Sequence, residues 1–165
     1  MNEENYAEWI VKRKDPVYAI PVKVIMVVLC VFALIIAMGS IVGAIFLLAL
    51  LALTYFVFLN LSVEFEYTWI DGDLAIDRIL SKARRRKVLK CQKEEIQFVA
   101  PSDSYMLKDY EKNGMKVKDC SSGQPGASTY SLIYQRGSEC VKVIFEPNEK
   151  MLRSMRLSIP GKMPR

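Results

Sequence analysis

The chain has 165 residues, of which 52% are hydrophobic and 25% charged, and its formal net charge is +5. No charged residue occurs from Val24 to Val63, and forty uncharged residues are too many for an ordinary core helix, which excludes a wholly soluble protein. Because the sequence contains no histidine, it also excludes histidine-based acid–base catalysis, histidine-activated nucleophiles and histidine-containing metal sites.

The first sixteen residues form a short segment of mixed polarity. Tyr6, Trp9, Ile10 and Arg13 recur at helical spacing, which predicts a short helix lying in the membrane interface. Trp9 would then be an anchor at the level of the lipid headgroups. A frayed polar tail is the alternative for the same residues. We expect residues 1–16 to lie on the cytoplasmic side.

Residues 17–62 predict a transmembrane hairpin. Each crossing needs about 20 apolar residues, so we expect helices at about 22–38 and 41–59, separated at Met38-Gly39-Ser40. Lys23 lies just inside the first helix, where its long side chain can reach the headgroups as a second interface anchor. Ala37-Met38-Gly39 also has the form of a signal-peptide cleavage site, but the second apolar stretch follows directly, which disfavours cleavage.

Basic residues flank the hairpin on both sides. Residues 12–14 and Lys23 precede its apolar core and further lysines and arginines follow it, so the positive-inside rule predicts a multi-pass protein of the cytoplasmic membrane with both termini in the cytoplasm. The four cysteines include no C-x-x-C pair, which favours reduced, buried thiols over a zinc site or a disulfide framework.

The periodicity changes to two after Ser62 and predicts a domain at residues 63–165. Asp71-Gly72-Asp73 indicates a hairpin turn rather than a calcium loop, because the pattern of oxygen ligands and glycine that calcium requires is incomplete. We expect a helix within 102–113 and a C-terminal helix at about 147–158, opened by Pro147. The expected strands are 63–69, 74–80, 86–91, 96–100, 115–120, 129–135 and 140–146.

Seven antiparallel strands followed by one helix are the order of a pleckstrin-homology-like (PH-like) barrel, so the predicted fold is an α+β membrane protein in which a two-helix hairpin precedes that barrel. Segments spread over the chain, among them Glu66-Tyr67-Thr68, Asp71-Gly72-Asp73-Leu74 and the stretch 145–152, resemble an uncharacterised family of small bacterial membrane proteins. That family, a domain of unknown function, has two transmembrane helices and a PH-like domain. The resemblance implies this fold and a membrane location, and it transfers no functional residue.

The candidate functional residues form a basic loop. The first strand starts almost directly after the second apolar helix, so the second strand returns toward the membrane and delivers the loop to the lipid surface. We predict that it contacts anionic headgroups; the alternative is a solvated turn that only sets topology. The loop residues are Lys82, Arg84, Arg85, Arg86 and Lys87. Two further segments, 121–126 and Glu94-Glu95, are expected to be a flexible loop and a solvated face.

These features predict a non-enzymatic membrane protein without cofactor or metal. Its PH-like domain would bind anionic membrane lipids or a protein partner. The alternative is a structural subunit or scaffold whose hairpin packs against other membrane helices or a second copy of the chain. Nucleic acid is not an expected partner, because no stripe of aromatic residues alternates with Lys and Arg.

Overall fold

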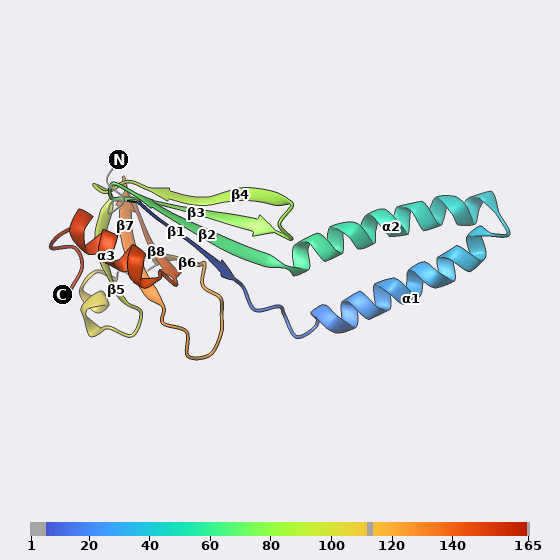
Figure 1. Ribbon diagram of the computed structural model, residues 1–165, viewed down its shortest axis with the longest axis horizontal. Coiled ribbons are helices and arrows are strands. Elements are labelled where there is room, and N and C mark those ends of the chain that lie inside the picture. The colour runs from blue at the N-terminus through green and yellow to red at the C-terminus, as the bar shows by residue number, and fades with distance from the viewer. Residues whose placement is uncertain (1–5, 112–113, 165) are drawn as a thin grey trace. The chain divides into compact units, whose positions relative to one another are not determined.

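A computed structural model describes residues 6–111 and 114–164. The chain divides into two compact units (Figure 1). The helical unit comprises Asp15–Val63 and Leu80–Arg84. Of the described residues, the β unit contains 6–14, Glu64–Ile79, 85–111 and 114–164.

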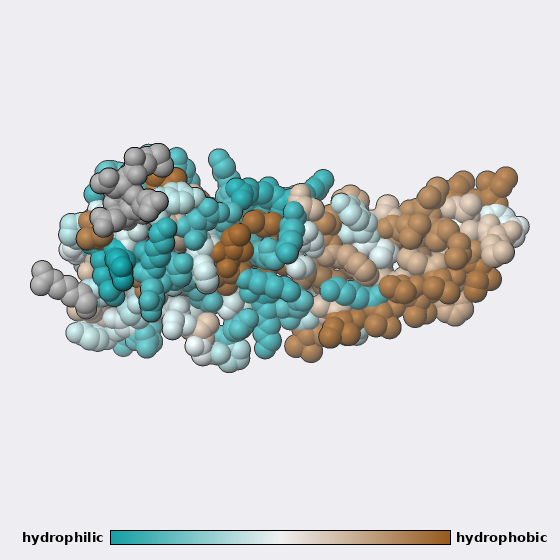
Figure 2. All heavy atoms as spheres, viewed as in Figure 1, coloured by the Kyte–Doolittle hydropathy of each residue, from teal (hydrophilic) through white to brown (hydrophobic). Residues whose placement is uncertain are grey.

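Two long apolar helices, α1 (Ala19–Ala37) and α2 (Ile41–Leu61), form an antiparallel hairpin in the helical unit. The first begins three residues earlier than predicted because Pro21 falls in its opening turn, where a missing N–H costs no helical hydrogen bond. Ser40 caps the second by accepting a hydrogen bond from the Gly43 N–H at 3.0 Å. Both helices are long and apolar enough to cross a membrane, and hydrophobic side chains cover them (Figure 2).

Close packing between the helices depends on small residues. A Cβ atom added to Gly43 would lie 2.7 Å from the carbonyl oxygen of Ile36, so the two backbones approach where only glycine fits. Farther along the hairpin, Ala33 is buried, and the Cys30 thiol lies 3.4 Å from the Thr54 hydroxyl. The predicted hairpin is therefore confirmed as two paired apolar helices.

The first sheet has the strand order β1-β2-β3-β4 and contains one strand that was not expected. Its strands are β1 (Tyr6–Lys12), β2 (Val63–Ile70), β3 (Asp73–Leu80) and β4 (Arg84–Cys91). β1 pairs antiparallel with β2, with Ala7 opposite Trp69 and Val11 opposite Phe65. The predicted interfacial helix is wrong, because Ala7 and Val11 are buried side chains of a strand. Residues 1–5 of that prediction lie outside the described residues.

This arrangement places the helical hairpin inside a strand-to-strand connection. The chain leaves the sheet after β1, forms α1 and α2, and returns as β2, the direct neighbour of β1. The β domain therefore needs residues on both sides of the hairpin, and does not consist of the segment after Ser62 alone.

The second sheet has the order β5-β7-β8-β6. Its strands are β5 (Ile96–Pro101), β6 (Lys116–Asp119), β7 (Tyr130–Arg136) and β8 (Glu139–Phe145). All seven predicted strands are present, but β6 runs parallel to β8, so the all-antiparallel arrangement is wrong for that pair. The two sheets remain separate, and the expected closed barrel is not formed.

Helical segments complete the β unit. The expected helix within 102–113 is only a short 3₁₀ turn, η2 (Tyr105–Asp109), and residues 112–113 lie outside the described part of the chain. The C-terminal helix α3 (Glu149–Ser158) begins two residues later than predicted, because the Asn148 side chain caps it by accepting from the Met151 N–H at 2.8 Å. Its apolar stripe, Met151 and Met155, is fully buried.

Candidate functional site

The predicted basic loop begins with a tight turn that is fixed to the end of α2. The Ser81 hydroxyl lies 3.2 Å from the carbonyl oxygens of both Phe58 and Leu59, and the Ser81 N–H donates to the Ser62 carbonyl at 2.8 Å. Ser81 and Lys82 adopt left-handed backbone angles, with φ of 44° and 59°, which these bonds compensate. The turn and Arg84 belong to the helical unit, so their attachment to α2 lies within one compact body.

The remaining basic residues are not a loop. Residues 84–87 form the first half of β4, and all four are exposed. The hairpin between β3 and β4 thus consists only of the short turn around Lys82, and regular sheet pairing begins at Arg84. This corrects the prediction, since strand geometry rather than loop flexibility sets where these side chains point.

Arg85 differs from its neighbours because its charge is engaged by carboxylates. It lies 2.5 Å from Glu66 and 3.8 Å from Asp77. The Glu66 side chain is only 6% exposed; burial, and then a hydrogen bond with Glu8, raise its pKa. Tyr6 donates to Glu8 at 2.6 Å, and this bond lowers the pKa of Glu8. Arg85 is therefore paired with Glu66 and Asp77, whereas Lys82, Arg84, Arg86 and Lys87 have no ion-pair partner among the described residues.

A second basic segment, residues 12–14, follows β1 at one end of the first sheet. The register places Lys12 opposite Glu64, near the start of β2. Residues 12–14 therefore lie at the end of the sheet where β2 begins. The sequence alone indicates only that residues 12–14 contribute to membrane orientation, because the pattern of residues 6–12 does not predict the strand β1.

Two arginines flank Phe65 on the inner face of this sheet end. The Arg13 guanidinium carbon lies 5.9 Å from the centre of the Phe65 ring. Arg78 shares the face of the buried residues Leu74 and Ile76, and the two-residue turn between β2 and β3 places it opposite Phe65. The Arg78 Nε is buried without a hydrogen-bond partner in the described part of the chain.

The two predicted interface anchors occupy different units. Trp9 lies in β1 opposite Tyr67 and is 43% exposed, so it is part of the sheet and not of a helix. Lys23 lies near the start of α1 and is half-buried. Membrane contact of either side chain stays a prediction.

Two other predictions about polar segments are wrong for part of their residues, whereas residues 123–126 and Glu94 are exposed as expected. Ser121 and Ser122, expected in a flexible loop, are buried: the Ser121 hydroxyl donates to Asp119 at 2.6 Å and the Ser122 hydroxyl to Glu146 at 2.7 Å. Glu95, expected on a solvated face, binds the Arg136 guanidinium, and that bond lowers the pKa of Glu95 to about 2.

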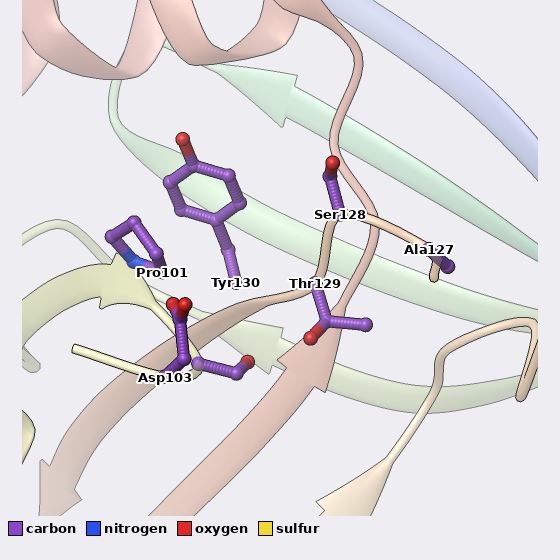
Figure 3. Close-up of a pocket in the computed structure, with 7 residues that line it drawn as sticks. Pro101, Asp103, Ala127, Ser128, Thr129 and Tyr130 are labelled. Carbon is purple, nitrogen blue, oxygen red and sulfur yellow. The ribbon is translucent and has the colours of Figure 1, made fainter. Parts of the chain in front are cut away.

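A pocket of about 620 Å³ lies where β5 ends and β7 begins. Figure 3 shows the Tyr130 ring beside Pro101, with the Asp103 carboxylate and the Thr129 side chain below it. Among the described residues that line it, Asp103 supplies the one carboxylate, and the others contribute hydroxyl and apolar groups. The described residues contain no group of three or more acidic or cysteine side chains suited to a metal ion.

Comparison with known proteins gives one result. Residues 3–165 match the family model described as bacterial PH-like domain (DUF6106), which includes both apolar helices. No curated protein and no solved structure gives a significant match.

Proposed function

Since the chain belongs to the bacterial PH-like domain family DUF6106, we propose that it is a non-enzymatic, membrane-anchored lipid-binding protein. The helices α1 and α2 span the cytoplasmic membrane twice and leave both termini in the cytoplasm. The exposed cations of the basic turn and of early β4 contact anionic lipid headgroups. These cations are Lys82, Arg84, Arg86 and Lys87, with Arg85 held mainly by Glu66.

The observation that carries the proposal is the attachment of the basic turn to α2. The bonds from Ser81 to Phe58 and Leu59 hold the turn at the end of an apolar helix, where a membrane-spanning helix meets the headgroups. Each basic residue near an anionic leaflet contributes about 1 kcal/mol. Four unpaired cations give an upper limit of about 4 kcal/mol, and salt reduces this within a Debye length of about 10 Å at 0.1 M.

The chemistry of the cysteines supports a non-enzymatic role. Burial raises the pKa of Cys91 to about 12 and that of Cys120 to about 11, so neither thiol is ionised at neutral pH. A nucleophilic cysteine requires the opposite shift, because the thiolate is the reactive form.

The test compares lipid selectivity of the full chain reconstituted in vesicles. Association of spin-labelled phosphatidylglycerol is measured against spin-labelled phosphatidylcholine at low and high salt. One variant replaces the four unpaired cations with Gln, and a matched control replaces four exposed cations elsewhere. The control positions are Lys108, Lys150, Arg153 and Arg156.

We expect the wild type and the control to prefer phosphatidylglycerol at low salt. The variant that lacks the four unpaired cations should lose most of that preference. Equal selectivity in all three proteins would refute headgroup binding by this turn. A protein partner that co-purifies regardless of lipid charge would then favour the structural-subunit alternative.

A further inference from the structure

We infer that the inner face of the first sheet holds a phosphate-binding site at its basic end, formed by Arg78, Arg13 and Lys118. The site lies wholly within the β unit. The ligand chemistry is a phosphate monoester, and its assignment to a lipid headgroup rather than a soluble ester rests on the proposed function.

Arg78 is the first element of the site. Its neighbours on the same face of β3, Leu74 and Ile76, are fully buried, so the Arg78 side chain starts within the apolar layer between the sheets. Its Nε is shielded from solvent and has no acceptor among the described residues. Desolvating a guanidinium nitrogen without an acceptor is unfavourable, and such a group in a native structure requires an explanation. A bound anion supplies the missing acceptor.

Arg13 is the second element. It follows the last residue of β1, and its guanidinium lies over the ring of Phe65, the residue opposite Arg78. The next residue fixes this segment, because the Lys14 N–H donates to the Ser122 carbonyl at 2.7 Å. Arg13 is exposed and has no carboxylate partner in the described chain.

Lys118 brings a third cation from the second sheet. Its ammonium donates to the Val88 carbonyl of β4 at 3.2 Å, which leaves further donors of the same group available. Burial raises the pKa of the Cys120 thiol, whereas Lys118 and Arg13 both act to lower it, so the two cations lie near the same residue.

The chemistry of these groups selects the ligand. The carboxylates of Asp119 and Glu146 are occupied by Ser121 and Ser122 and are not ion-paired with the three cations. An anion with close to two negative charges and three acceptor oxygens fits this arrangement. The planar guanidinium of Arg78 can bind two phosphate oxygens in a fork, which a lysine cannot do.

The experiment uses the full chain and two phosphate probes. In neutral detergent micelles, glycerol 3-phosphate is titrated by calorimetry. In nanodiscs of phosphatidylcholine with a minor fraction of either phosphatidic acid or phosphatidylglycerol, retained lipid is counted by native mass spectrometry. The variants are Arg78→Lys and Arg78→Met, with Arg153→Gln, an exposed arginine of α3, as the matched control. Near-UV circular dichroism checks that each variant is folded. Arg78→Lys keeps the positive charge and the aliphatic part of the side chain, so it provides the test if Arg78→Met does not fold.

We expect Arg78→Lys to weaken binding of the phosphate monoester about tenfold, as for a lost bidentate contact, while Arg153→Gln keeps it. A loss confined to phosphatidic acid identifies a lipid headgroup as the source, and a loss confined to glycerol 3-phosphate identifies a soluble ester. The inference is overturned if folded Arg78 variants bind both probes with the same affinity as the wild type. It is also overturned if the wild type binds neither probe. Phosphatidylglycerol selectivity that depends on the basic turn would leave the proposed function standing in either case.

Discussion

The pairing of Glu95 with Arg136 allows a quantitative test of how the two sheets are joined. Arg136 ends β7 in the second sheet, and its Nε and Nη2 bind the two Glu95 carboxylate oxygens at 2.6 and 2.8 Å. The same Nη2 donates to the carbonyl of Lys90 in β4, a strand of the first sheet. The perturbation is Glu95→Gln, alone and combined with Arg136→Gln in a double-mutant cycle.

The expected magnitude follows from geometry and exposure. A hydrogen bond to a charged group contributes about 1.5–3 kcal/mol when sheltered, whereas exposed ion pairs contribute about 0.2–1 kcal/mol. The side chains of Glu95 and Arg136 are 18% and 55% exposed, which places the pair between these limits. Because the contact is bidentate, we expect a coupling free energy of about 1–1.5 kcal/mol at neutral pH.

The effect has a defined pH dependence. Arg136 lowers the pKa of Glu95 to about 2 in the folded protein, while an unfolded glutamate titrates near about 4.3. Stability from this carboxylate is therefore complete above the unfolded pKa and is lost as the pH falls toward 2. The stability advantage of the wild type over Glu95→Gln should shrink steadily between about pH 5 and pH 2.

Urea unfolding of the full chain in neutral micelles, followed by tryptophan fluorescence, measures the free energies. The neighbouring exposed Glu94 provides the matched control, and Glu94→Gln should change stability little at any pH. A coupling energy near zero at pH 7, or a difference between wild type and Glu95→Gln that is the same at pH 7 and pH 3, would refute the reasoning.

Three further predictions concern other contacts. Tyr67→Phe removes a buried hydroxyl that donates to the Cys120 carbonyl at 2.6 Å and should lower the free energy of unfolding by about 1–2 kcal/mol, measured by the same urea titration. Gly43→Ile should separate α1 from α2 and reduce disulfide cross-linking of an engineered cysteine pair across the hairpin. Gly39→Ala should leave this cross-linking unchanged, because a Cβ atom at position 39 would lie 3.9 Å from its nearest neighbour, the Ile36 carbonyl oxygen. Deleting residues 6–12 should abolish protease resistance of the β unit, because the deletion exposes one edge of β2; unchanged resistance would contradict the role given to β1.

Local patterns predicted most of the fold. The uncharged stretch predicted the helical hairpin, alternation predicted β2, and strand-like runs predicted β3 to β8. β1 was missed because its seven residues fit both periods: Tyr6, Trp9 and Ile10 suggest a helix, whereas Ala7 and Val11 are the positions that pack. Its partner strand lies beyond the whole hairpin, and local periodicity does not reveal such pairing. The parallel direction of β6 is likewise set by β8 and not by its own four residues.

The candidate site divides in the same way. The basic residues within 82–87 were recognisable in the sequence as a run of positive charges. Their position soon after α2 predicted that they lie at one end of the sheet. The ion pair between Arg85 and Glu66 was not visible in the sequence, because Glu66 lies in β2 and Arg85 in β4, with β3 between these strands. The convergence of Arg13 and Arg78 on Phe65 also depends on β1, so an error in one short strand concealed both arginines.

The insertion of the helical hairpin between β1 and β2 has a consequence for biosynthesis. β1 leaves the ribosome first and has no partner until some fifty further residues have been made, a delay of about 3–10 s at typical rates of translation. In the topology that we propose, both apolar helices enter the membrane during this interval and return the chain to the side on which β1 lies. A nascent chain that inserts only one helix leaves β1 and β2 on opposite faces of the bilayer, where they cannot pair. Completion of the sheet is thereby conditional on correct insertion, and a chain with a single crossing presents an unpaired β2 edge to the proteases that remove misassembled proteins.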